Sequence, residues 1–173
     1  MNPPQSDLNE LIQYYQEGRY DLAETLAKAI AQKYPDHQFS WKVLGAVYQL
    51  IGRLQDSLIA NQRAVAISPT DAELHNNLSV TLRELGKLED AEARCKKSLS
   101  IKPDYAEAHN NLGITLKELG NLEDAEASCR MAIAIKPSLA EAHNNLGIIL
   151  QELGKLKEAD KSFREAIAIK PEF

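Results

Sequence analysis

Glycine and proline recur at a fixed interval of 34 residues along the chain, and this period constrains the fold more than any other feature. Glycine favours the left-handed conformation that ends a helix, and proline cannot continue one. Two such interruptions in each period therefore predict two helices per repeat. The glycines of this series are Gly18, Gly52, Gly86, Gly120 and Gly154, and the prolines are Pro35, Pro69, Pro103, Pro137 and Pro171.

The five periods align with one another as repeats of similar sequence. Residues 72–105 and 106–139 share 21 of 34 residues without a gap, and residues 140–173 continue the same register. Residues 38–71 fit with more divergence, and residues 4–37 with more still. The alignment predicts five repeats with these boundaries.

Within residues 106–139, apolar residues follow helical spacing in two blocks. Leu112, Leu116 and Leu119 precede Gly120, which predicts a first helix over 106–119. Apolar residues three and four positions apart then continue toward Pro137, which predicts a second helix over 122–135. The residues of this second block are Leu122, Ala125, Cys129, Ala132 and Ile133.

Charge and hydropathy exclude two classes of partner. The net charge is -5 and no run of lysine and arginine is dense, which argues against binding to nucleic acid. No apolar run is long enough to span a membrane, and the first residues lack the pattern of a secretion signal. We therefore expect a cytoplasmic protein without a membrane partner.

The two cysteines, Cys95 and Cys129, occupy the same position in successive repeats. Repeats that stack at helix-packing distance, about 8 to 10 Å, place their Cα atoms beyond the limit of about 7 Å for a disulfide. We expect both to be free, buried thiols.

Trp41, Leu44, Gly45, Tyr48, Ala64 and Pro69 together resemble the tetratricopeptide repeat, and the likeness extends over essentially the whole chain. The resemblance implies an all-α, right-handed α-solenoid of five 34-residue helix-turn-helix units, whose first helices line a concave face. Some positions depart from the family pattern. These are Ser79 in place of glycine, Leu82, Leu116 and Leu150 in place of tyrosine, and Asn61, Cys95 and Cys129 in place of the second aromatic residue.

The motif HNNLG occurs at residues 109–113 and 143–147, with HNNLS at 75–79. The second asparagine of each motif resembles the asparagines that line the arm of O-linked N-acetylglucosamine transferases. A carboxamide can pair with both the N–H and the C=O of a peptide bond, so the resemblance implies a ladder of asparagines that reads peptide backbone. The alternatives remain open that the asparagines only cap helices, or bond within and between neighbouring first helices, and that the near-identity of the repeats reflects recent duplication alone.

The peptide-binding residues implied by the family's concave positions include both asparagines of each motif, an aliphatic row and two basic residues. Asn77, Asn111 and Asn145 are the expected backbone contacts, whereas a structural role is favoured for Asn76, Asn110 and Asn144. Val80, Ile114 and Ile148 would bury apolar side chains, and Arg83 and Lys117 would select acidic neighbours.

No catalytic residue, metal ligand or cofactor site is expected. His75, His109 and His143 lie a full repeat apart, which is too far for them to bind the same zinc ion. We therefore assign them packing or surface roles. Ser79 follows His75 by one helical turn, but no acid is evident to orient the histidine.

We therefore predict a non-enzymatic module that binds a protein or an extended peptide. An alternative is an assembly scaffold, because the sequence stops at a repeat boundary without a polar closing helix. Phe163, Ala166 and Ile167 would then be partly exposed and could support end-to-end self-association. A third interpretation makes this segment the substrate-recognition arm of a larger glycosyltransferase-like enzyme.

Overall fold

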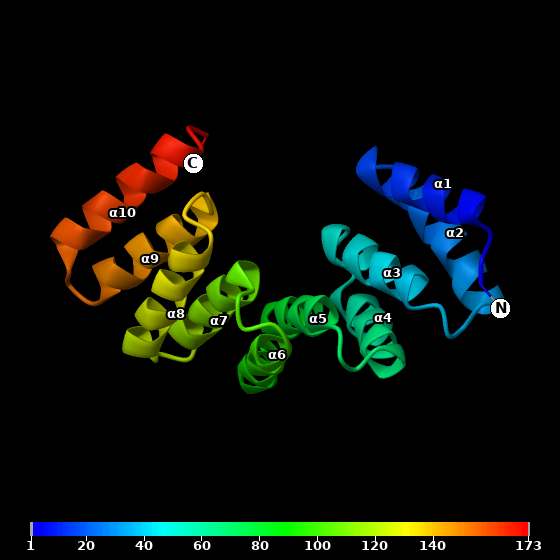
Figure 1. Ribbon diagram of the computed structural model, residues 1–173, viewed down its shortest axis with the longest axis horizontal. Coiled ribbons are helices and arrows are strands. Elements are labelled where there is room, and N and C mark those ends of the chain that lie inside the picture. Colours follow the sequence, from blue (N-terminus) through cyan, green and yellow to red (C-terminus); the bar gives the residue numbers. More distant parts are fainter. Residues whose placement is uncertain (1, 173) are drawn as a thin grey trace. The chain divides into compact units, whose positions relative to one another are not determined.

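The computed structural model describes residues 2–172, which form ten α-helices and no strand (Figure 1). The helices alternate between the first helix of a repeat, which we term an A helix, and the second, a B helix. The A helices are α1 (Gln5–Gln16), α3 (Gln38–Leu50), α5 (Ala72–Glu84), α7 (Ala106–Glu118) and α9 (Ala140–Glu152). The B helices are α2 (Tyr20–Lys33), α4 (Leu54–Ile67), α6 (Leu88–Ile101), α8 (Leu122–Ile135) and α10 (Leu156–Ile169).

The predicted fold class, all-α with tandem helix-turn-helix units of the solenoid type, is confirmed. The predicted bounds of α8 match, and α7 ends one residue earlier than expected because Leu119 is its C-cap. Gly120 follows with φ of 83°, and the N–H of Asn121 donates to the Leu116 carbonyl at 2.9 Å. This geometry satisfies the last carbonyls of α7 and turns the chain into α8.

The chain divides into two compact units, Met1–Leu85 and Gly86–Phe173, which we call the N-terminal and C-terminal units. In the N-terminal unit, α1 to α5 pack in sequence order, and α3 also touches α5. Its core gathers small and aliphatic side chains between the A and B helices, among them Leu11, Ala23, Ala27, Leu44 and Val47.

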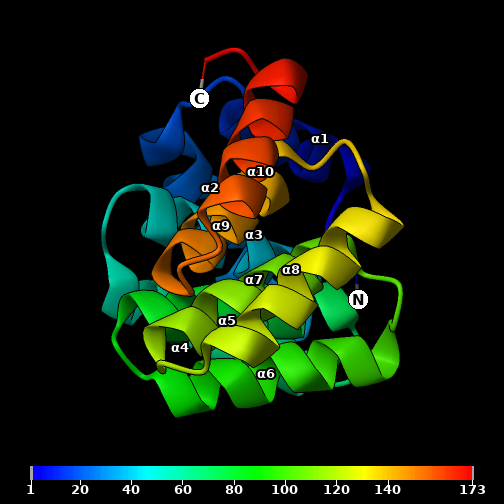
Figure 2. The same cartoon turned by 90° about the vertical axis from the view of Figure 1, so that its left-hand side faces the viewer.

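In the C-terminal unit, α6 packs on α7, α7 on α8, α8 on α9, and α9 on α10. Figure 2 views this unit from the side on which α10 lies. Cys95 and Cys129 are thiols outside any disulfide and are fully buried in its core, as predicted. Burial raises the pKa of the Cys129 thiol to about 12, so this group remains protonated at neutral pH.

A second series of glycines allows the two helices of one repeat to approach closely. A Cβ atom on Gly113 would lie 2.5 Å from Cys129 Sγ and 3.1 Å from the backbone oxygen of Ala125. Gly45 approaches Asn61, and Gly147 approaches the ring of Phe163, in the same way. The glycine therefore makes room for a side chain of the B helix.

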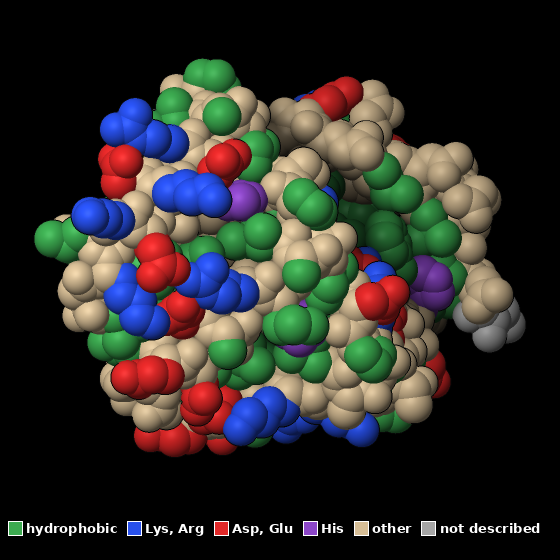
Figure 3. Space-filling view, turned by 60° about the vertical axis from the view of Figure 1, so that its left-hand side comes forward, with side chains coloured by type: hydrophobic (Ala, Val, Ile, Leu, Met, Phe, Trp, Pro, Cys, Tyr) green, Lys and Arg blue, Asp and Glu red, His purple; other side chains and the backbone are tan. Residues whose placement is uncertain are grey.

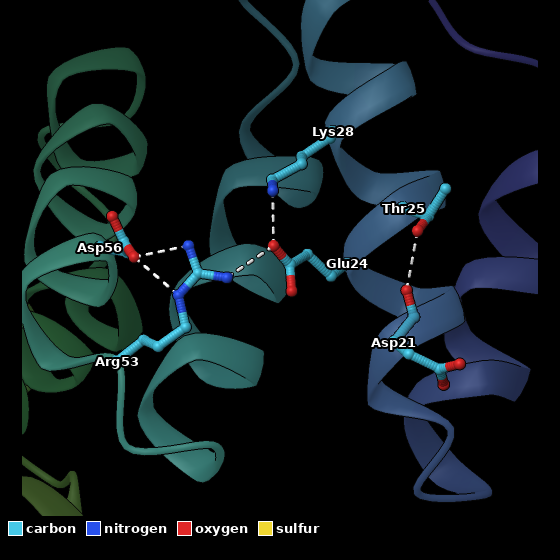
Figure 4. Close-up of polar contacts among 6 residues, drawn as sticks. All are labelled: Asp21, Glu24, Thr25, Lys28, Arg53 and Asp56. Atoms are coloured by element: carbon cyan, nitrogen blue, oxygen red, sulfur yellow. Dashed lines mark hydrogen bonds and ion pairs between the residues drawn. The ribbon is translucent and has the colours of Figure 1, made fainter.

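Charged side chains connect successive B helices within each unit. In the N-terminal unit, Glu24 of α2 accepts from Lys28 and from Arg53 Nη1 at 2.9 Å, and Arg53 also pairs with Asp56 at 2.6 Å (Figure 4). The equivalent positions of the C-terminal unit hold the same charges. Glu126 pairs with Arg130 at 2.8 Å and with Lys155 at 2.7 Å, and Arg130 pairs with Glu158 at 2.7 Å.

One expectation about the last repeat is wrong. Ala166 was predicted to be partly exposed, but only 1% of its surface is accessible, because it faces α9 in its own helix pair. Phe163 is half-buried against Gly147, whereas Ile167 is 49% exposed.

None of the described helices combines the length and the apolar character needed to cross a membrane.

Candidate functional site

The histidine that begins each HNNLG-type motif bonds to the carbonyl of the proline that precedes its helix. Trp41 occupies the equivalent position in the second repeat and makes the same contact. Trp41 donates its indole N–H to the carbonyl of Pro35 at 2.9 Å. The histidines at the equivalent positions make the same contact through Nε2: His75 with Pro69 at 3.0 Å, and His109 with Pro103 and His143 with Pro137 at 2.9 Å. Because a carbonyl only accepts, each Nε2 carries the proton. The histidines thus have the packing role expected of them, and the constant spacing of six residues was the available signal for the bond.

Two asparagines of the C-terminal unit bond to each other across neighbouring A helices. Asn145 Nδ2 of α9 donates to Asn110 Oδ1 of α7 at 3.0 Å. Asn110 is 8% exposed and Asn145 is half-buried. Here the structure shows the inter-helix bond that the sequence left open as an alternative.

The other asparagines have different surroundings. Asn76 is buried and Asn111 is half-buried. Asn77 and Asn144 are half-buried, and their side-chain amides form no hydrogen bond to any described residue. Asn77 and Asn144 therefore keep free donors and acceptors.

The free amide of Asn77 lies in a groove of the N-terminal unit, which we call the inner groove. This groove has a volume of about 490 Å³ and lies along the A helices α1, α3 and α5. Ile12 and Tyr15 of α1 and Phe39 and Val43 of α3 supply its apolar lining. The volume falls within the usual range of ligand pockets, roughly 300 to 1,000 Å³.

Two polar contacts connect α3 and α5, two of the helices along the inner groove. Lys42 Nζ lies 2.6 Å from Glu73 Oε1, and Gln49 Nε2 donates to Glu84 Oε1 at 3.0 Å, so both connect α3 to α5. Burial raises the pKa of Tyr15, which keeps its phenol neutral and able to donate at physiological pH. The groove therefore combines apolar walls with neutral hydrogen-bonding groups and one balanced ion pair.

The floor of the inner groove contains a polar network that the sequence did not reveal. Asn61 Nδ2 donates to Thr81 Oγ1 at 3.0 Å and to Ser57 Oγ at 3.3 Å. Ser57 in turn donates to the carbonyl of Gly45 at 2.8 Å. Asn61 is 1% exposed, and its Oδ1 lacks a partner within residues 2–172. Asn61 stands where the family pattern expects an aromatic residue, and that departure was the only available signal.

The remaining predicted contacts lie along the A helices. Val80, Ile114 and Ile148 are half-buried, and so are Arg83 and Lys117. Lys117 Nζ lies 4.0 Å from Glu152 Oε1 of the next repeat. Among the described residues, no group of three or more histidine, cysteine or acidic side chains could hold a metal ion.

The repeat geometry agrees with a comparison against protein families. Models described as tetratricopeptide repeat match residues 8–72, 70–138 and 104–172. The chain belongs to the tetratricopeptide repeat family. No similar sequence is found among the curated proteins.

Solved structures share the fold of this tetratricopeptide repeat protein. PilW, described as a widely conserved type IV pilus biogenesis factor, has a TM-score of 0.88 and 23% identity over 95% of this chain and 76% of its own. TTC0263, a thermophilic TPR protein of Thermus thermophilus, has a TM-score of 0.81 and 28% identity over 96% of this chain and 91% of its own. YrrB, described as a TPR protein with an unusual peptide-binding site, has a TM-score of 0.72 and 17% identity over 95% of this chain and 85% of its own.

Proposed function

We propose that this protein is a non-catalytic interaction module, and that the inner groove of the N-terminal unit holds an extended peptide. The observation that carries the proposal is the free amide of Asn77, which lies in a groove with apolar walls. A half-buried carboxamide without a partner is free to pair with an incoming peptide bond. A peptide ligand is also consistent with the site described for YrrB, which shares the fold.

Each part of the inner groove has a role in this proposal. Asn77 pairs with the N–H and C=O of one peptide unit, and Ile12, Tyr15 and Phe39 bury an apolar side chain of the ligand. Lys42 can exchange its contact with Glu73 for a ligand carboxylate, because the Lys42 side chain keeps 27% of its surface exposed. Affinity then comes from the apolar contact, and the amide fixes the orientation of the backbone.

The three backbone-reading asparagines predicted from the sequence are therefore assigned different roles. Asn77 reads the ligand, whereas Asn145 chiefly holds α9 against α7 through Asn110. In the C-terminal unit, the remaining candidate contacts are Asn111, Asn144, Ile114, Ile148 and Lys117, and in the N-terminal unit they are Asn76, Val80 and Arg83.

Two alanine variants test this assignment. Asn77→Ala should leave the free energy of unfolding nearly unchanged and weaken binding of selected peptides about tenfold, through loss of one or two hydrogen bonds. Asn145→Ala should cost about 1 to 2 kcal/mol of stability, because it leaves the buried Asn110 oxygen unpaired. Peptides selected from a random library on the intact protein serve as probes, and urea unfolding gives the stabilities. Unchanged peptide affinity in Asn77→Ala would show that this amide does not read the ligand.

Self-association is the second candidate function, and exposed apolar residues on α10 favour it. Leu156 is 65% exposed and Ile167 is 49% exposed on the same helix. Sedimentation of the wild type and of Ile167→Lys tests this role, since a dimer held by α10 should dissociate in the variant. The interpretation of this segment as the substrate-recognition arm of a larger glycosyltransferase-like enzyme remains a prediction.

A further inference from the structure

A second groove lies in the C-terminal unit, between the B helices α8 and α10 and above the A helix α9. We call it the outer groove; its volume is about 520 Å³. Leu146 and Leu150 of α9 form its apolar floor, and Ile133 and Ala134 of α8 form one wall. The asparagines proposed to bind peptide do not line it, so the outer groove is separate from the proposed peptide site.

Polar groups without partners converge on this groove. The bond from His143 Nε2 to Pro137 leaves Nδ1 as an acceptor, and His143 lines the groove. Ser162 of α10 is 8% exposed, and its hydroxyl makes no hydrogen bond to a described residue. The Ser162 hydroxyl is not one of the fully buried polar atoms, so it can form a hydrogen bond with a ligand that lies in the groove.

The other wall, α10, presents one cation and one anion. Lys161 and Glu165 are both exposed, and neither forms an ion pair with any described residue. The remaining charges at the groove are already neutralised, because Arg130 binds both Glu126 and Glu158. On the face of the molecule shown in Figure 3, lysine and arginine side chains (blue) and acidic side chains (red) lie beside exposed hydrophobic side chains (green).

The spacing of the two free charges fits an extended chain. Residues four apart on a helix are separated by about 6 Å along its axis, at 1.5 Å per residue. Residues two apart on an extended strand are separated by about 6.6 Å, and both point to the same side. The residue between them points to the opposite side, which here is the apolar wall formed by Ile133 and Ala134.

We propose that the outer groove docks an extended segment of a partner protein in which an acidic and a basic residue flank a large aliphatic residue. The acid pairs with Lys161, the base pairs with Glu165, and the aliphatic side chain packs on the wall formed by Ile133 and Ala134. Backbone N–H and C=O groups of the segment supply the partners for His143 Nδ1 and the Ser162 hydroxyl.

The N-terminal unit contains an equivalent groove that should not take this segment. It lies between α2 and α4, has a volume of about 450 Å³, and has Trp41, Leu44 and Tyr48 along its floor. Ile59 and Arg63 occupy the positions of Lys161 and Glu165 there. The pair of opposite charges is therefore a property of α10. The groove between α2 and α4 lacks this pair and serves as an internal control.

Charge reversal on α10 tests the proposal. The probes are labelled short peptides with Asp-Leu-Lys, Asp-Leu-Asp or Lys-Leu-Lys at the centre, and fluorescence anisotropy measures their binding to the intact chain. The wild type should prefer Asp-Leu-Lys, Lys161→Glu should prefer Lys-Leu-Lys, and Glu165→Lys should prefer Asp-Leu-Asp. Each preference should be about fivefold, the scale of an exposed ion pair. These rankings do not depend on the direction in which the peptide lies.

Two further measurements distinguish peptide binding in the outer groove from binding in the inner groove. Amide NMR signals of residues around His143 and Ser162 should shift when Asp-Leu-Lys peptide is added, and Asn77→Ala should bind that peptide as the wild type does. Circular dichroism checks that the variants remain helical, which is expected because Lys161 and Glu165 are exposed. If all three proteins rank the peptides alike, or if the shifts appear elsewhere, the proposal is wrong.

Discussion

At the level of single residues, the chain uses two different rings for one contact. Trp41 and three histidines occupy equivalent positions, and each donates a ring N–H to the carbonyl of a proline six residues earlier. That carbonyl lies beyond the end of the preceding B helix, where no helical N–H can reach it. The ring therefore satisfies a backbone group and fixes the start of the next A helix.

Substitution at His109 tests this contact. His109→Phe keeps an aromatic ring but removes the N–H, so we expect a loss of about 1 kcal/mol in the free energy of unfolding. His109→Trp restores a donor of the type that Trp41 uses, and it should recover part of that loss. Urea denaturation of the three proteins gives the comparison. Equal stability of the phenylalanine and tryptophan variants would exclude a stabilising role for the bond.

The two series of glycines are required for different reasons, and alanine variants distinguish them. Gly113→Ala should cost about 1 to 3 kcal/mol, because its Cβ would clash with Cys129 Sγ. Gly120→Ala should cost about 1 to 2 kcal/mol, because residue 120 has φ of 83° and has nothing within 4 Å of a Cβ atom.

Adding Cys129→Ala to each glycine variant distinguishes the steric clash at residue 113 from the backbone strain at residue 120, with stability measured by urea unfolding. It should restore part of the stability lost in Gly113→Ala, and the remainder reflects the contact with the Ala125 oxygen. It should restore none of the stability lost in Gly120→Ala. Equal rescue of both variants would contradict this explanation.

At the level of helices, the charged groups that connect successive B helices make stability depend on pH. The pKa of Glu126 is lowered, first by its bond to Lys155 and then by Arg130, and its side chain is only 13% exposed. A carboxylate whose pKa is lower in the folded state stabilises the fold above its unfolded pKa of about 4.3. That contribution is lost as the pH falls through the lower folded value.

Glu126→Gln should therefore lower stability at neutral pH by several tenths of a kcal/mol to about 1 kcal/mol, and should flatten the acid side of the stability curve. Urea unfolding at a series of pH values between about 3 and 7 measures both effects across this range. Glu123→Gln, in the exposed first turn of the same helix, is the matched control. An unchanged acid slope in Glu126→Gln would mean that this network does not contribute to acid sensitivity.

How far the sequence predicted these elements depends on the range of the interactions involved. The bounds of α8 follow from apolar spacing and nearby helix-breaking residues, which are local signals, and they were predicted correctly. Asn77 and Asn145 both follow His-Asn and precede Leu in the sequence. The residue 35 positions earlier is Lys42 for Asn77, but for Asn145 it is Asn110, to which Asn145 donates a hydrogen bond. The sequence could not tell which asparagine is paired, because that depends on contacts between separate helices. Ala166 was misjudged because its exposure depends on packing inside its own helix pair.

At the level of the whole molecule, helices within each of the two units contact mainly their neighbours in the sequence. The chain forms two compact units, and within each unit the packing passes from one helix to the next. Stability in such a protein is approximately a sum of local terms and nearest-neighbour terms. Among the described helices, α10 packs mainly on α9, so within residues 2–172 its opening costs less than opening of a helix packed on two neighbours.

Hydrogen exchange tests this dependence through Phe163, whose ring fills the space above Gly147. Phe163→Ala should destabilise the contact between α9 and α10 by about 2 kcal/mol, less than for a fully buried phenylalanine. Amides of α10 should then exchange faster, while those of α2 to α4 keep their wild-type protection. Uniformly faster exchange throughout the chain would instead mean that both units open together. In that case a change at the last repeat would alter every binding surface at once, whereas local opening would leave the inner groove intact when α10 is released.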